Sequence, residues 1–136
     1  MKNIFLILVL FATVSYGQLV VNTELDVVSE GDGLTSLREA VIYANQTAGQ
    51  QTVTLDGSVF LPGANRIVYL KSALELTDAS GTIIDGSAGK ITLDGSQIDS
   101  SADNFKNALV LKSGNNEIAN IYLQNFLGAA ILIDSL

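Results

Sequence analysis

The string Thr-Leu-Asp-Gly-Ser occurs twice in this chain, at residues 54–58 and 92–96, and Ile-Asp-Gly-Ser at residues 84–87 repeats most of it between them. Each copy ends a short run of β-branched and apolar residues, and Asp-Gly is a common turn between two strands. The rest of residues 52–133 keeps this rhythm, with short apolar runs separated by turns. Self-similarity on this scale indicates a solenoid.

The spacing of the runs favours one kind of solenoid. With no helical pattern between them, three short strands for each turn of chain suit a β-helix better than a leucine-rich or propeller repeat, and each coil stacks on the next in parallel. We therefore predict an all-β fold, a right-handed parallel β-helix. The expected strands lie at residues 52–55, 66–70, 73–76, 82–84, 90–93, 108–111, 117–123 and 130–133. Three asparagines near strand ends are expected to turn inward and hydrogen-bond to one another along the stack: Asn115, Asn120 and Asn125.

One segment before the repeats has a helical period instead. An apolar stripe recurs at i, i+3, i+4 and i+7 from Leu37 to Ala44. Ser36 precedes the stripe and Glu39 lies three residues later, which is the pattern of a capping box. The sequence thus predicts a short helix over residues 36–44 that ends near Asn45.

The position of this helix suggests its role. The first coil of a β-helix has an open strand edge and an apolar cross-section, and both promote aggregation unless they are covered. We interpret the helix as an N-terminal cap whose Leu37 faces the first coil, so that Leu37→Asp should cause misfolding. Arg38 is expected to be exposed and to pair with Asp32 or Glu30. The expected cap residues are Ser36, Leu37, Arg38, Glu39, Ala40, Val41 and Ala44.

The N-terminus has the pattern of a signal peptide. A positive start at residues 1–3 precedes the apolar run Ile4–Val14, and small residues at positions 15 and 17 predict cleavage after Gly17. A membrane anchor is the alternative, but a span needs about 20 apolar residues. We expect a signal peptide at 1–17, a strand and the capping helix at 18–51, the first β-helix coils at 52–136, and a secreted or cell-surface protein.

The composition excludes several classes of function. Without Lys2, the mature chain has six basic and 14 acidic residues, a formal charge of −8, and its acidic residues are scattered. This balance argues against nucleic acid or anionic membranes as partners. The chain has no cysteine and no histidine, which excludes disulfides, thiolate or histidine metal sites and Ser-His-Asp triads. No second apolar run is long enough to span a membrane.

The remaining candidates for chemistry each have a simpler structural interpretation. Asp56, Asp85 and Asp94 of the repeated units are weak candidates for Ca²⁺ ligands, but their uneven spacing favours turns. Lys71 and Lys112 each follow an apolar strand and could lie on one face as catalytic bases, although solvated strand ends explain them more simply. No catalytic residue and no cofactor other than a possible Ca²⁺ ion is predicted.

The aromatic residues are few. They could form a sugar-stacking groove, but packing in the core or in loops is the favoured interpretation because most lie in apolar strands. The residues concerned are Tyr43, Tyr69, Tyr122, Phe60, Phe105 and Phe126.

The string at residues 35–40, Thr-Ser-Leu-Arg-Glu-Ala, also carries a family resemblance. Together with residues 19–23, Gly31–Gly33 and Ala44-Asn45, it resembles the CSLREA domain family, which is found at the N-termini of exported bacterial proteins ahead of a pectin-lyase-like β-helix. The resemblance covers about residues 19–95. Thr35 replaces the family's cysteine. The resemblance implies a fold and a compartment rather than a reaction.

The last residues, 129–136, form an apolar strand with no polar cap after it. Since solenoids need caps at both ends, we expect either a longer native protein, which is favoured, or end-to-end self-association through this open edge. The expected function is that of an exported β-helix protein, structural or adhesive or carbohydrate-binding, with a polysaccharide or cell-surface component as partner. The alternative is an N-terminal fragment of a polysaccharide lyase or glycoside hydrolase.

Overall fold

The computed structural model describes residues 18–99, 101 and 106–134, so the expected signal peptide lies outside the described residues. Within these residues, one helix and ten strands follow one another. They are β1 (Gln18–Val21), α1 (Leu37–Gln46), β2 (Gln51–Leu55), β3 (Arg66–Tyr69), β4 (Leu74–Leu76), β5 (Thr82–Asp85), β6 (Ile91–Asp94), β7 (Leu109–Leu111), β8 (Glu117–Ala119), β9 (Ile121–Gln124) and β10 (Ile131–Ile133).

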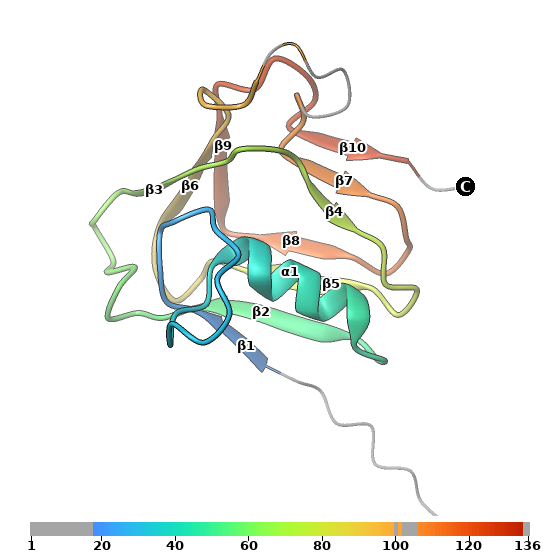
Figure 1. The fold of residues 1–136 in the computed structure, drawn as a ribbon, viewed down its shortest axis with the longest axis horizontal. Coiled ribbons are helices and arrows are strands. Elements are labelled where there is room, and N and C mark those ends of the chain that lie inside the picture. The colour runs from blue at the N-terminus through green and yellow to red at the C-terminus, as the bar shows by residue number, and fades with distance from the viewer. Residues whose placement is uncertain (1–17, 100, 102–105, 135–136) are drawn as a thin grey trace, which may run out of the picture.

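The strands form a right-handed parallel β-solenoid of three coils, as the repeats predict. From β2 on, every third strand joins the same sheet, and β1 adds to the first: sheet A is β1-β2-β5-β8, sheet B is β3-β6-β9 and sheet C is β4-β7-β10. All pairs are parallel. Figure 1 shows the three sheets around the outline of a triangle, with each coil passing through A, B and C in turn.

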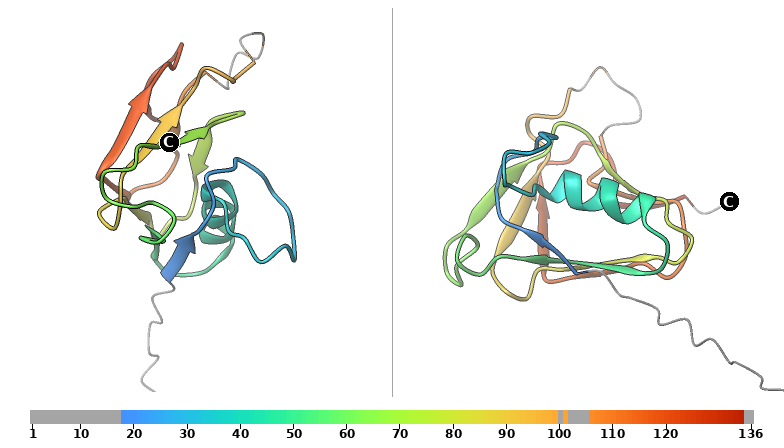
Figure 2. Two further views of the ribbon diagram at one scale, coloured as in Figure 1. Left: turned by 90° about the vertical axis from the view of Figure 1, so that its left-hand side faces the viewer. Right: turned by 60° about the horizontal axis from the view of Figure 1, so that its bottom comes forward.

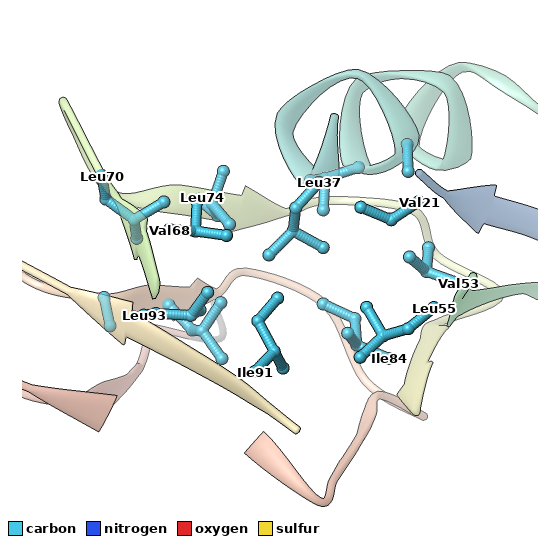
Figure 3. Packing of buried hydrophobic residues seen from close by; sticks show 14 of the residues in the cluster. Val21, Leu37, Val53, Leu55, Val68, Leu70, Leu74, Ile84, Ile91 and Leu93 are labelled. Atoms are coloured by element: carbon cyan, nitrogen blue, oxygen red, sulfur yellow. The ribbon is translucent and has the colours of Figure 1, made fainter. Parts of the chain in front are cut away.

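The core fills this triangle with rows of apolar side chains from each sheet. Val53 lies opposite Ile84 in sheet A, Val68 opposite Leu93 in sheet B, and Leu74 opposite Leu109 in sheet C. All six are at most 2% exposed, and Figure 3 shows side chains from the different sheets meeting in the interior. Because side chains alternate along a strand, the residues between these rows point away from the core, and most are partly or fully exposed, although Thr92 and Asp94 of β6 are only 3% exposed.

The helix covers the N-terminal end of the solenoid, as predicted. It contacts β1, β2 and β4, and Figure 2 shows it lying across the coil. Its buried stripe is the expected one, Leu37, Ala40, Val41 and Ala44. Helix α1 is far too short to cross a bilayer, and the described residues contain no other helix that could.

Two expectations about the asparagines are wrong. The expected strand 117–123 is two strands, β8 and β9, because Asn120 adopts a left-handed conformation and turns the chain between sheets A and B. Asn115 and Asn125 are also left-handed, and all three are exposed rather than turned inward. Asparagine tolerates this conformation better than other residues with a side chain, so these positions make the corners themselves.

Candidate functional site

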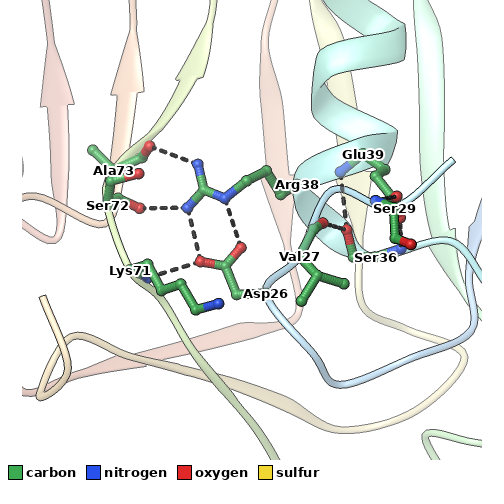
Figure 4. A network of polar contacts seen from close by, with 9 residues as sticks. All are labelled: Asp26, Val27, Ser29, Ser36, Arg38, Glu39, Lys71, Ser72 and Ala73. Carbon is green, nitrogen blue, oxygen red and sulfur yellow. Dashed lines mark hydrogen bonds and ion pairs between the residues drawn. The ribbon is translucent and has the colours of Figure 1, made fainter.

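The polar residues of the Ser36–Ala40 string tie the cap to the first coil. The Arg38 guanidinium donates to both carboxylate oxygens of Asp26, at 2.7 Å from Nε and 2.9 Å from Nη2. The same guanidinium donates to the carbonyl of Ser72 at 2.8 Å, and Asp26 also accepts from the Lys71 amide at 2.7 Å. Figure 4 shows these contacts joining α1 to the turn between β3 and β4. The Asp26 side chain is 1% exposed and that of Arg38 is 18% exposed, so the carboxylate of this ion pair is buried.

The predicted partners of Arg38, Asp32 and Glu30, are therefore wrong. Asp32 accepts a hydrogen bond from the amide of Leu34, two residues later, and so serves its own turn. Glu30 is exposed. Asp26 takes their place because the loop before the helix brings it beneath Arg38, a contact between positions 12 residues apart that helical spacing does not reveal.

Ser36 and Glu39 form the predicted capping box. The Ser36 hydroxyl accepts from the Glu39 amide at 3.1 Å and donates to the carbonyl of Val27 at 2.6 Å. The Glu39 carboxylate accepts from the amides of Ser29 and Ser36 at 2.6 and 2.7 Å, and these bonds lower the pKa of Glu39. Both side chains hold the loop before the helix in place, so residues 36–40 have a structural role.

The three Asp-Gly-Ser units are turns, as favoured from the sequence. In each unit the aspartate Oδ1 accepts from the serine amide two residues later, at 2.8 Å for Asp56, 2.9 Å for Asp85 and 2.7 Å for Asp94. The register places Asp85 in sheet A opposite Thr54, and Asp94 in sheet B. The structure therefore does not bring the three together, and the described residues include no group of three or more acidic side chains that could hold a metal ion.

The hydrogen bonds keep these carboxylates ionised. The Ser58 and Ser87 hydroxyls and amides lower the pKa of Asp56 and Asp85. Burial raises the pKa of Asp94, but hydrogen bonds from Ser96, Gln124 and Asn125 outweigh it and lower that pKa to about 2. A carboxylate held in this way is a poor general acid at neutral pH.

The two lysines do not share a face. Lys71 lies before β4 and Lys112 follows β7, so they sit at opposite ends of the strands of sheet C. Lys112 pairs with Glu75 at 2.9 Å. Solvated strand ends are the better interpretation of both.

The aromatic residues divide into two groups. Phe60 is fully buried and Phe126 packs against the core, as expected, whereas Phe105 lies outside the described residues. The tyrosines differ from the expectation, because Tyr43, Tyr69 and Tyr122 are 53%, 41% and 58% exposed. Tyr69 and Tyr122 occupy outward positions that alternate with inward Val68, Ile121 and Leu123, a period-2 signal already present in the sequence.

Two of these tyrosines share the outer face of sheet B. Tyr122 lies opposite Thr92, and Tyr69 lies opposite Asp94, which lies opposite Gln124. From standard strand dimensions, two strands and two residues separate the tyrosine Cα atoms by about 12 Å. Between them, Gln124 donates to Asp94 at 2.7 Å, so the polar side chains of this face are fixed by hydrogen bonds.

A hollow of about 440 Å³ adjoins Tyr122 on this face. The Lys90 ammonium lies 4.9 Å from the centroid of the Tyr122 ring, and no carboxylate of the described residues pairs with Lys90. The hollow is lined by Pro62, Gly63, Ser87, Gly89, Lys90, Asn120, Ile121 and Tyr122. An aromatic ring beside an ammonium and an amide offers contacts for both the apolar and the hydroxyl-bearing sides of a ring-shaped ligand.

Two other surfaces expose apolar side chains. One is a hollow of about 350 Å³ outside the cap, lined in part by Val28, Leu34 and Tyr43. The other is the third coil, where β10 is an edge strand and its Ile131–Ile133 are exposed. Nothing among the described residues covers either surface, and the expected end-to-end association through the second stays a prediction.

Comparisons with protein-family models, with curated proteins and with solved structures give no match to this chain. The resemblance to the CSLREA domain family thus has no support beyond the residues that carry it, and the function must be argued from the geometry alone.

Proposed function

We propose that this chain is an exported, non-catalytic β-solenoid that binds a polysaccharide or cell-surface glycan through the outer face of sheet B. The observation that carries the proposal is the pair of half-exposed tyrosines on that face, Tyr69 and Tyr122, with Lys90 beside the second. Export is the expectation from the signal-peptide pattern of residues 1–17.

The chemistry of the face suits a saccharide. A sugar ring presents an apolar face that an aromatic side chain can cover and a rim of hydroxyl groups that needs hydrogen-bond partners. Tyr69 and Tyr122 supply two such platforms on one rigid sheet, about 12 Å apart by standard strand dimensions. Lys90 and Gln124 supply polar groups close to them. A neutral glycan is favoured, because the mature chain has a formal charge of −8 that repels an acidic one.

A lyase or hydrolase is less well supported. Such an enzyme needs a base or a pair of carboxylates aimed at a substrate site. The two aspartates closest to the proposed surface, Asp85 and Asp94, are instead occupied by serine and amide donors. Their geometry therefore favours a structural role, in turns that position the surface. It does not favour a role in which these carboxylates react with a ligand.

The test is depletion of the secreted protein from solution by a panel of insoluble polysaccharides, cellulose, chitin and xylan among them. Tyr69→Ala and Tyr122→Ala should each weaken binding about tenfold, the usual loss when a central aromatic contact is truncated, and the double variant should weaken it further. Tyr43→Ala is the matched control, because Tyr43 is equally exposed but lies on the cap.

Equal loss in all three variants would indicate nonspecific adsorption and would contradict the proposal. Binding by the parent that survives the double substitution would place the surface elsewhere. Release of unsaturated or reducing sugar ends from the polysaccharide would favour the enzyme instead.

A further inference from the structure

Gln18 is expected to be the first residue of the mature chain. It is the residue that follows the expected cleavage point after Gly17, so that export, as proposed above, would leave its amino group as the N-terminus of the mature chain. The inference that follows rests on that proposed export.

The structure leaves the Gln18 side chain free to react. Gln18 is exposed at the start of β1, and β1 is an edge strand of sheet A. Within the described part of the chain, its amide makes one hydrogen bond, to the Thr54 hydroxyl at 3.3 Å. That distance lies beyond the usual range for an N–H donor, so the contact holds the amide weakly.

We propose that Gln18 of the mature protein is converted to pyroglutamate. The neutral α-amino nitrogen attacks the side-chain carbonyl carbon Cδ, the bond from that nitrogen to Cδ forms, and the bond from Cδ to Nε2 breaks. The α-amine gives up one proton to the departing nitrogen, which leaves as ammonia. No electrons are gained or lost. The α-amino group has a pKa of about 8, so a useful fraction is neutral at physiological pH.

The modification would protect the strand that anchors the cap. Val21 at the end of β1 is fully buried, and the next residue, Asn22, accepts from the Thr35 amide at 2.6 Å and donates its own amide to the Thr35 carbonyl at 3.0 Å. An aminopeptidase that removes residues from the N-terminus would therefore shorten β1 toward Asn22, whose hydrogen bonds to Thr35 hold the start of the capping segment. A lactam has no free amino group for an aminopeptidase, but it keeps an N–H donor.

The test is peptide mass spectrometry and Edman sequencing of the full chain, freshly collected after secretion by its native host. The expected N-terminal peptide begins at Gln18, is lighter than the unmodified peptide by one ammonia, and resists Edman degradation. Gln18→Ala is the control, which should begin at the same position, have its full mass and sequence normally.

The outcomes separate the two proposals. A peptide that begins at Gln18 with its full mass and an open amino group would overturn the cyclisation while leaving export intact. A chain that keeps residues 1–17, or that begins at another residue, would overturn the proposed cleavage and the cyclisation with it.

Discussion

Replacement of Arg38 by methionine tests whether the ion pair between Arg38 and Asp26 fixes the capping helix to the solenoid. The substitution keeps an unbranched apolar stem but removes the guanidinium that contacts Asp26, Ser72 and the carbonyl of Ala73. Asp26, which is 1% exposed, keeps only the Lys71 amide as a donor. Its charge would then be buried without a counterion.

The expected loss is large for a single substitution. Breaking a buried ion pair by removing one partner costs about 3–5 kcal/mol. A domain of this size has a total stability of about 5–15 kcal/mol. With a urea dependence of about 2 kcal/mol per molar, the midpoint should fall by roughly 2 M.

The assay is urea unfolding of the mature chain, followed by circular dichroism. Arg66→Met is the matched control, because Arg66 pairs with Glu24 at 2.9 Å but both side chains are more than 40% exposed. Such a pair is worth about 0–1 kcal/mol. If Arg38→Met costs no more than Arg66→Met, the argument that the buried pair locks the cap is refuted.

Three further perturbations address the coils, the turns and the cap. Gly81 and Gly63 both have positive φ, but a methyl group at Gly81 would meet the Asn115 carbonyl whereas one at Gly63 meets nothing. In thermal unfolding, Gly63→Ala should therefore lower the stability by about 1–2 kcal/mol and Gly81→Ala should lower it clearly more. Equal losses of stability would refute the close stacking of the coils. The pKa of Asp94 is lowered from 3.8 to about 2, so the ionised carboxylate contributes its full stabilisation of the fold above about pH 4 and loses it as the pH falls toward 2. The urea midpoints of the parent and of Asp94→Asn should converge in that interval. A difference that stays constant with pH would contradict this role of Asp94. Leu37→Asp should aggregate on expression while Ile42→Asp, at an exposed position of the same helix, should stay soluble, and two soluble variants would contradict the role of the helix as a cap.

The fold was largely predictable because the sequence patterns of its strands and of its helix are both local. Alternation and Asp-Gly turns indicate strands that lie within short windows, and the spacing of Leu37, Ala40, Val41 and Ala44 indicates a helix with one buried face. The capping box is equally local, since Ser36 and Glu39 are three residues apart. Parallel stacking then follows from the repeat itself.

The features that the sequence did not reveal depend on contacts across the fold. Arg38 meets Asp26 through a loop whose path no local pattern specifies. The split at Asn120 needs a backbone conformation that an apolar run of β-prone residues hides. Tyr69 and Tyr122 come from different coils, and only the strand register places them on one face, so the proposed binding surface could not be recognised from single strands.

A disulfide across two coils tests the parallel register most directly, because the chain has no cysteine to interfere. Thr52 and Ile83 are directly opposite each other on the outer face of sheet A, about 4.8 Å apart as neighbouring strands are, which is within disulfide reach. The pair Thr52→Cys and Ile83→Cys should crosslink fully under mild oxidation, seen as faster migration on a non-reducing gel. Thr54→Cys with Ile83→Cys, displaced by two residues and about 8 Å apart, should not. Equal crosslinking of both pairs, or of the displaced pair alone, would contradict the parallel three-strand coil on which the whole account rests.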